Sequence, residues 1–553
     1  STLILLLYIE LYIFFVMKCI SEFGYFFLRS LGIGVVKTTS PNEENLMTRI
    51  FKISNIYFLL LIIYPIISIK SQIKPESIIN QKNRIEFEVG YLDRNYFVSS
   101  NNETMILVRD YETGKEIEWR ILKLDQDLSQ EKEISVNLDR SLELYKIIPL
   151  EKYYYLLFKK NYSNDKIYTL IRYDINENNI LKQDINLPLS LEIVDFLIYN
   201  NKLVFYSNTR NNKNLISIYD LISNQLNNIY EYLYYESEII KLERFDENNF
   251  LVLVSERQNS LKTLERRIYN LNGEKENVIK SNSDNYSLLN SKKYLTEDYL
   301  LSVSLIAEKN SNESEGIQIE KINGIEDNVE SINFLKINGF KDSILTINKG
   351  LNKKLKSKKI KNIRLGYEFF IDSVFKKDNT FYVSLETIKP NFNNDGFSNY
   401  SYMPFYNTYS GTYDRKVNPN FGGYSHEIGI LISFDINLKS ISVNAFEVNK
   451  FETFYRKPYY KYLISDDKII NFYVNKGKIF ISKFNSTTKK SKRNYISIHP
   501  RNKDNIVIKT ETNPEGTRHW YSNNYITYGI QKLKLQNGKN KRVFFITNFE
   551  ITP

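Results

Sequence analysis

A short motif recurs along the chain at intervals of about fifty residues, and this repeat constrains the fold more than any other feature. Two of its copies are nearly identical: LIRYDINENNI begins at Leu170 and LISFDINLKSI begins at Leu431. Each copy is an apolar run followed by Asp, polar residues and a second apolar run. With Asp or Asn at the same point, the motif recurs at Asp125, Asp174, Asp220, Asn270, Asn323, Asp435, Asn485 and, more loosely, Asn548.

Each repeat contains four short β-strand patterns in the same order. Runs rich in Ile, Leu, Tyr, Phe and Val alternate with polar clusters, which is typical of strands joined by turns. In one repeat, EIVDFLIYNNK is followed by LVFYSNTRNNKN, LISIYDLISNQ and LNNIYEYLYY. Four-stranded units of forty to fifty residues, repeated around an axis, are typical of a β-propeller. The sequence therefore predicts an all-β propeller between residues 84 and 552, with eight blades, or seven as the alternative count.

The two ends of the repeat region predict how the ring closes. The last repeat holds only three strand patterns, RHWYSNN, YITYGIQKLKL and KRVFFITNFEI. At the other end, RIEFEVG (Arg84 to Gly90) precedes the first complete repeat. Pairing this spare strand with the last repeat would remove two open sheet edges. We therefore expect the N-terminal strand to complete the last blade.

The recurring Asp or Asn is interpreted as turn chemistry. It follows the third strand of each repeat, and its short side chain can accept a hydrogen bond from the backbone two residues later. The stretch DINEN resembles the start of a calcium-binding loop, but the Gly and the distal Glu of such a loop are missing. One such residue per blade explains the repeat without a metal.

The segment before the repeats has the layout of an export signal. Arg49 and Lys52 follow Met47, and an apolar run extends from Ile56 to Ile67. This run is short for a membrane span. We expect residues 47–72 to be a signal peptide cleaved near Ser71 or Gln72, or else an uncleaved anchor. Residues 1–46 are expected to be upstream translation or an extension, and residues 73–553 a single domain.

Composition excludes several classes of protein. The single cysteine, Cys19, excludes an intrachain disulfide framework and a cysteine-rich metal site. The net charge is +11 over 553 residues, which is far from the dense basic stripe of a nucleic-acid-binding protein. The 43 Tyr and 34 Phe residues favour strands.

The interval between Asn323 and Asp435 is about twice the others, which predicts an insertion at about 340–427. Its first part, INKGLNKKLKSKKIKNIRL, is strongly basic. We interpret it either as a solvated loop or as a contact for an acidic partner or lipid headgroups. The residues of this basic patch are Lys353, Lys354, Lys356, Lys358, Lys359, Lys361 and Arg364.

The second part of the insertion, from Asn391 to Glu427, is rich in aromatic residues. It is predicted to be a long loop between the second and third strands of one blade, and loops of this length are usually functional or disordered. Tyrosine among Ser, Gly and Asn is typical of adaptable binding surfaces. The alternative is a loop that packs on its own propeller. The candidate binding residues are Tyr400, Tyr402, Phe405, Tyr406, Tyr409, Tyr413 and Tyr424.

No catalytic or metal motif emerges from the sequence. The motifs GxSxG, HExxH, Walker A and CxxC are absent. The three histidines, His426, His499 and His519, fall in different repeats and not at metal-ligand spacing. We therefore assign no catalytic residue, no cofactor and no metal.

Two C-terminal stretches resemble a group of uncharacterised exported proteins of Bacteroidota. They are FGGYSHEIGILISFDINLKSISVNAFEVNK and GTRHWYSNNYITYGIQKLKLQNGKNKRVFFITNFEI. The resemblance covers the chain from about residue 420 to its end. It implies a periplasmic, secreted or outer-membrane-associated propeller, and it implies no catalytic residue and no substrate.

Fold alone does not define function. The expected function is an exported, monomeric binding module of the cell envelope with a protein or glycan partner and no nucleic acid. The N-terminal apolar segments would allow membrane association. One alternative is a glycan- or peptide-processing enzyme with its site in the propeller channel. The other is a membrane-anchored structural subunit of an envelope complex.

Overall fold

The described part of the chain is built from antiparallel β-strands, with one short 3-10 helix (η1, Phe334–Lys336) besides. The computed structural model describes residues 79–552, except for 338–366, 393–420 and shorter gaps in other loops. Residues Ile78–Pro553 make up one compact unit. In the described residues, no helix is long and apolar enough to cross a membrane.

Seven sheets each contain four strands that follow one another in the chain. Blades one and two are β2 (Asp93–Ser100), β3 (Met105–Glu112), β4 (Glu116–Leu124) and β5 (Gln130–Asp139), then β6 (Leu142–Leu150), β7 (Tyr153–Lys160), β8 (Ile167–Asp174) and β9 (Asn179–Asn186). Blades three and four are β10 (Glu192–Tyr199), β11 (Lys202–Asn208), β12 (Asn214–Asp220) and β13 (Leu226–Ile229), then β14 (Glu238–Arg244), β15 (Asn249–Gln258), β16 (Leu261–Asn270) and β17 (Lys275–Ser281). Blade five is β18 (Ser287–Leu295), β19 (Leu300–Ala307), β20 (Ser314–Ile322) and β21 (Asn328–Asn333). Blades six and seven are β22 (Glu368–Lys377), β23 (Thr380–Phe392), β24 (Phe421–Asp435) and β25 (Ile441–Thr453), then β26 (Lys461–Ser465), β27 (Lys468–Asn475), β28 (Lys478–Asn485) and β29 (Lys490–Ser497).

The eighth blade joins the two ends of the repeat region. Strand β1 (Ile79–Glu88) pairs antiparallel with the last strand, β33 (Asn540–Ile551), which pairs in turn with β32 (Asn524–Lys534). The first strand of this blade is split, because both β30 (Ile506–Thr510) and β31 (Thr517–Tyr521) pair with β32. The predictions of eight blades and of closure by an N-terminal strand are confirmed. The split first strand was not predicted.

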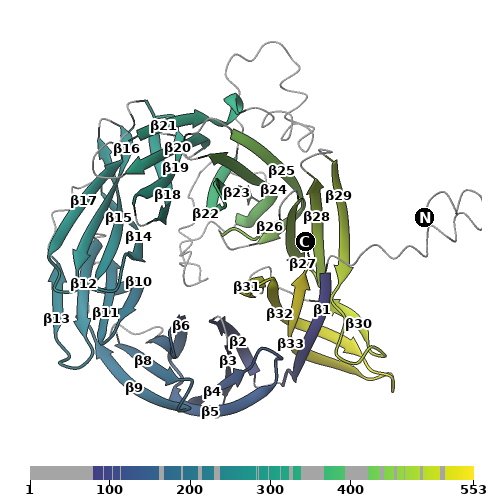
Figure 1. Cartoon of the computed structure of the whole chain (residues 1–553). Coiled ribbons are helices and arrows are strands. Elements are labelled where there is room, and N and C mark those ends of the chain that lie inside the picture. The colour runs from purple at the N-terminus through teal and green to yellow at the C-terminus, as the bar shows by residue number, and fades with distance from the viewer. Residues whose placement is uncertain are drawn as a thin grey trace, which may run out of the picture. The chain divides into compact units, whose positions relative to one another are not determined.

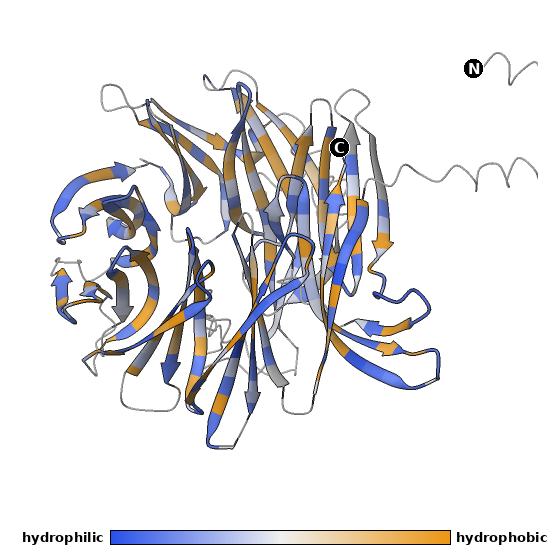
Figure 2. Ribbon diagram, turned by 60° about the horizontal axis from the view of Figure 1, so that its bottom comes forward, coloured by the Kyte–Doolittle hydropathy of each residue, from blue (hydrophilic) through white to orange (hydrophobic). Residues whose placement is uncertain are grey.

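The eight sheets form a ring, with the first strand of blades one to seven nearest the axis and the fourth at the rim, and with β31 as the innermost strand of the eighth blade (Figure 1). Apolar and polar residues are mixed along the strands (Figure 2). Inner strands such as β19 are buried throughout, whereas fourth strands such as β9 are mostly exposed. The apolar side chains meet between neighbouring blades. Trp119 on β4, for example, is 2% exposed and lies edge-on against Phe158 on β7, with ring centroids 5.0 Å apart. Burial of side chains of this size contributes on the order of 2 kcal/mol each, so the interfaces between blades form the core.

The recurring Asp or Asn begins the turn after the third strand, as predicted. The Asp125 carboxylate accepts hydrogen bonds from the backbone N–H groups of Asp127 (2.9 Å) and Ser129 (2.7 Å). Asp174, Asp220 and Asn270 each accept two backbone hydrogen bonds in the same way, and Asp435 accepts one from Asn437.

The prediction for Asn548 is wrong. This residue lies inside β33 and is fully buried. The third strand of the last blade has no turn after it, because its fourth strand is supplied by the other end of the repeat region. Asn323 and the side chain of Asn485 lie outside the described residues.

The predicted insertion at 340–427 is two separate segments. Between them lie β22 and β23, the regular first and second strands of the sixth blade. Residues 393–420 connect β23 to β24, the second and third strands, as predicted. The basic segment lies instead in the connection between the fifth and sixth blades.

Candidate functional site

One of the predicted binding residues lies in the described part of the chain. Tyr424 is on β24, is only 7% exposed and packs against Ile388 in the sixth blade. Its ring therefore belongs to the interior of that blade rather than to an exposed surface. The other aromatic candidates, Tyr400 to Tyr413, and all residues of the basic patch, Lys353 to Arg364, lie outside the described residues.

The three histidines lie in different places. His426 on β24 is fully buried, with its Nδ1 atom 2.5 Å from the Glu386 carboxylate on β23. The other Glu386 oxygen accepts hydrogen bonds from the backbone N–H groups of Tyr459 (2.6 Å) and Tyr460 (3.1 Å). This buried group therefore ties the sixth blade to the chain that enters the seventh. His499 bonds Gln81 through its backbone, and His519 bonds the Ser522 carbonyl.

The first strands of blades two to seven bring charged side chains to the inner part of the ring. We call this set the charged belt: Lys146 (β6), Asp195 (β10), Lys241 and Glu243 (β14), Lys292 (β18), Asp372 (β22) and Lys461 (β26). Strands β6, β10, β14, β18 and β22 each have a register shift beside these residues. Such bulges change the direction of side chains, and they often occur beside functional sites.

Most of the belt residues form ion pairs. The Nζ atom of Lys146 lies 2.5 Å from the Asp195 carboxylate of the next blade. Lys241 contacts Glu243 on the same strand. Between blades seven and six, the Lys461 Nζ atom lies 3.6 Å from the Asp372 carboxylate. Burial raises the pKa values of Asp195 and Asp372, although the neighbouring lysines, Lys146 and Lys461, act to lower them.

Lys292 differs from the other belt residues, because it forms no ion pair among the described residues. Burial, together with the nearby ammonium group of Lys241, lowers its pKa to about 8. Glu243 and Asp372 oppose this shift without forming a direct pair. The belt therefore contains one more lysine than carboxylates, and the additional cation is largely shielded from water.

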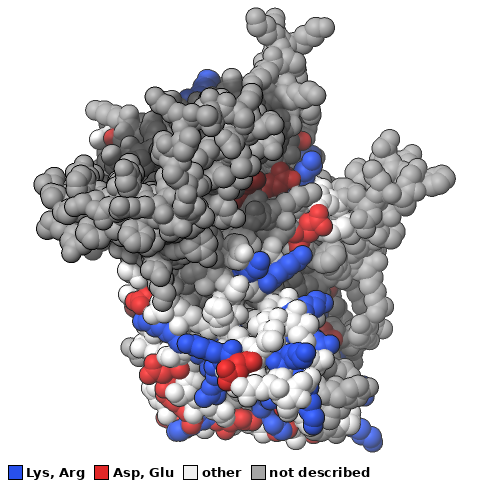
Figure 3. All heavy atoms as spheres, turned by 90° about the vertical axis from the view of Figure 1, so that its right-hand side faces the viewer, with Lys and Arg blue, Asp and Glu red and all other residues white. Residues whose placement is uncertain are grey.

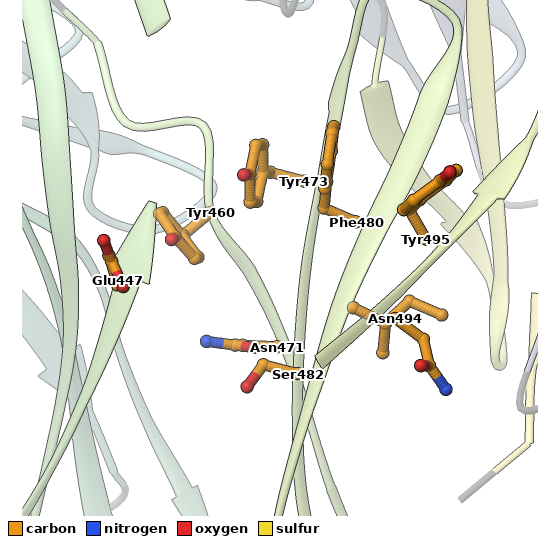
Figure 4. A pocket seen from close by; sticks show the side chains of 9 residues that line it. Glu447, Tyr460, Asn471, Tyr473, Phe480, Ser482, Asn494 and Tyr495 are labelled. Atoms are coloured by element: carbon orange, nitrogen blue, oxygen red, sulfur yellow. The ribbon is translucent and has the colours of Figure 1, made fainter. Parts of the chain in front are cut away.

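A hollow of about 240 Å³ lies between the sixth and seventh blades (Figure 4). On the seventh blade it is bordered by a row of aromatic residues, Tyr473, Phe480 and Tyr495, on β27, β28 and β29. Below this row lie Asn471 and Ser482, and Glu447 lies on the opposite side on β25 of the sixth blade. Tyr460 borders the hollow from the connection between the two blades.

Neither the belt nor the hollow was predicted from the sequence. Lys146, Asp195 and Lys241 lie at similar places in successive repeats, about fifty residues apart. An alignment of the repeats by strand would have shown a charged position in each first strand. The side chains that face each other across two blades could not be identified in this way.

Comparisons with known proteins give this chain neither a family nor a function. No protein-family model matches the chain, and no curated protein matches it. Among solved structures, it is similar to the WD40 domain of SCAP from fission yeast, with 10% identity, 86% of this chain, 98% of that chain and a TM-score of 0.40. It is also similar to the β-propeller domain of the Trilobed protease from Pyrococcus furiosus, with 12% identity, 74% of this chain, 99% of that chain and a TM-score of 0.31.

A prolyl endopeptidase structure also matches, with 10% identity, 82% of this chain and a TM-score of 0.36. The match spans 53% of that chain, so about half of the endopeptidase has a counterpart here. At these identities and TM-scores, none of the three similarities bears on what this chain does.

Proposed function

We propose that this protein is a binding propeller of the cell envelope that recognises an anionic group of its ligand at Lys292 in the charged belt. The observation that supports this is the unequal pairing of the belt. Lys146, Lys241 and Lys461 each have a carboxylate partner, whereas Lys292 has none among the described residues. A carboxylate, sulfate or phosphate group of a ligand would give Lys292 the anionic partner that the other three lysines already have.

The surroundings of Lys292 favour such an interaction. A charge-assisted hydrogen bond is about twice as strong as a neutral one, and its strength rises where water is excluded. Lys241 lies close by and adds a second positive charge. An anion also removes the unfavourable proximity of these two ammonium groups. Ligand binding should therefore raise the pKa of Lys292 and should weaken as the pH rises above 8.

The outer surface is consistent with a localised site. On the face shown in Figure 3, Lys and Arg side chains are interspersed with Asp and Glu. A surface of mixed sign gives no broad attraction for polyanions such as nucleic acids. Recognition of an anion then depends on a few placed groups rather than on net charge.

The proposal can be tested with glucuronate, inorganic phosphate and acetate as probes, using calorimetry on the full chain. We expect at least one probe to bind, and Lys292→Met to weaken that binding roughly tenfold or more, which is the loss of one charge-assisted hydrogen bond. Lys182→Met is the matched control, because Lys182 is an exposed lysine on β9, at the rim. Equal binding by Lys292→Met and the parent protein would overturn the assignment.

An enzyme that processes glycans or peptides is the second candidate. It is favoured by Asp195 and Asp372, carboxyl groups with raised pKa values in the same belt as a lysine with a lowered one. Groups with shifted pKa values cluster at active sites. Incubation with peptide and oligosaccharide libraries distinguishes the two. Turnover that is lost in Asp372→Asn would favour the enzyme, and binding without turnover would favour the binding protein.

A further inference from the structure

The hollow between the sixth and seventh blades is separate from the charged belt and differs from it chemically. Among the described residues, its lining includes one carboxylate, Glu447, and no cation. An anionic ligand is therefore disfavoured there. Tyr495 at its edge is 57% exposed on β29, a rim strand, so the hollow reaches the outer surface of the ring.

Asn471 gives the hollow an unused hydrogen-bonding group. Its side chain extends from β27 toward the side where Glu447 lies (Figure 4). The residue is only 2% exposed, and its amide nitrogen has no hydrogen-bond partner among the described residues. A buried donor without a partner costs about 1–3 kcal/mol. Such groups in native proteins usually have a partner from water or a ligand.

The aromatic rings of the hollow present mainly their edges. Tyr473 and Phe480 stack on each other, with nearly parallel planes (10°) and centroids 5.0 Å apart. The next pairs on either side, Tyr460 with Tyr473 and Phe480 with Tyr495, are tilted. Ring edges bear the positive part of the aromatic quadrupole, which suits oxygen atoms. Apolar contact is also available along the whole row.

These features define the chemistry of the occupant. It must accept a hydrogen bond from Asn471, tolerate or donate to the Glu447 carboxylate, and place oxygen atoms near the ring edges. Ligand pockets typically combine an aromatic lining with a few polar groups, and those for drug-sized ligands start at about 300 Å³. The hollow is smaller than this, about 240 Å³, so a single ring-sized polyol fits its size.

We propose that the hollow between the sixth and seventh blades binds one neutral sugar residue, with Asn471 as its buried hydrogen-bond donor. This site does not depend on the anion site proposed at Lys292, since the two share no residue. The aromatic row supplies contact area and the amide fixes orientation. Glu447 accepts from a sugar hydroxyl at the open side.

The test uses the full chain and the methyl glycosides of glucose and galactose, with N-acetylglucosamine as a third probe. Saturation-transfer NMR detects weak binding, and titration gives the dissociation constant. We expect one of the three to bind, and Asn471→Leu to weaken it roughly tenfold, which is the loss of one hydrogen bond to a buried amide. Glucuronate at the belt should be unaffected by this change, so failure of the sugar site does not affect the proposed function.

Asn548→Leu is the matched control. Asn548 is also fully buried, and neither atom of its amide has a partner among the described residues, but it lies in the eighth blade. It should retain sugar binding. Absence of binding by all three probes to the parent protein overturns the proposal and assigns the Asn471 amide to water. Equal loss of binding in both variants overturns it as well, because the effect would then be structural.

Discussion

The interface between blades one and two and the interface between blades six and seven use large aromatic rings in opposite ways. In the first, Trp119 on β4 lies against Phe158 on β7, so a ring from each blade fills the space between them. In the second, Tyr473, Phe480 and Tyr495 contact one another along a single blade. Phe446 of the sixth blade still contacts Tyr462 of the seventh, with ring centroids 6.0 Å apart, but the row along the seventh blade borders a hollow rather than a ring from the facing blade. A propeller whose blades share one topology can thus gain a binding site where aromatic rings contact one another along one blade instead of across two blades.

The largest expected effect is the loss of stability when a ring is removed from each of these two interfaces. Trp119→Ala should lower the free energy of unfolding by about 3–5 kcal/mol, because it opens a cavity in a filled interface. Phe480→Ala should cost clearly less, since its ring already borders an open space. Chemical denaturation of the two variants measures both values. Equal losses would mean that the sixth and seventh blades are packed as tightly as the first and second.

The next effect concerns the charged belt, which crosses the inner part of the interface between blades six and seven, where Lys461 lies near Asp372. The pKa of Lys292 is lowered to about 8 in the folded state, below the ordinary value for lysine. Between these two values the unfolded chain binds more protons, so stability should rise with pH across this window. Relative to Lys292→Met, the parent protein should gain on the order of 2 kcal/mol between pH 7 and pH 10.

Comparison with the variant is necessary here because buried tyrosines titrate at higher pH. Burial raises the pKa of Tyr154 to about 12, for example, and this residue destabilises the fold as the pH rises through 10. The same contribution is present in both proteins and cancels. Parallel stability curves for the parent and Lys292→Met would show that Lys292 is solvated, and the argument for an anion at the belt would lose its basis.

A smaller effect is expected at the turn of the second blade. Asp174 accepts two backbone hydrogen bonds there, and its carboxylate lies 3.3 Å from the Lys152 ammonium group. Each net hydrogen bond contributes about 1 kcal/mol. Asp174→Ala should therefore lower the free energy of unfolding by about 2 kcal/mol. Denaturation midpoints of the parent protein and the variant check this value, and equal midpoints would mean that the turn contributes no net stability.

The turns also explain why so much of the fold was predictable. Asp125, Asp174 and Asp220 act on their own backbone within a few residues, so their role is local and visible in the sequence. The missing fourth strand of the last repeat was equally visible, and the N-terminal strand was its only unassigned partner. Asn548 was misinterpreted because the same local pattern occurs where no turn follows.

The sites were not predictable, because they depend on contacts between blades. The lack of a partner for Lys292 follows from which strands are neighbours in the ring and from bulges such as the one between Leu288 and Ser291. The amide nitrogen of Asn471 has no partner among the described residues, and this depends on which side chains the sixth blade places opposite it. Tyr424 was expected to be exposed with the loop before it, but β24 already begins at Phe421, and the register with Thr453 brings its ring into the blade.

The smallest expected effect on stability comes from the connection between β23 and β24. Replacing residues 394–419 by a short Gly-Ser turn retains both strands in full, and with them Tyr424 and the buried pair of Glu386 and His426. Loop-closure entropy changes by only about 0.6 kcal/mol for each doubling of loop length, so the shortened protein should unfold at nearly the same denaturant concentration. Glucuronate and the methyl glycosides should still bind, because the described residues that form the belt and the hollow are all retained. Capture of a protein or glycan partner should be lost, if the aromatic residues Tyr400 to Tyr413 form the adaptable surface that their composition predicts.

An unfolded product would instead place the segment in the core of the sixth blade, and unchanged partner capture would leave the belt and the hollow as the binding sites.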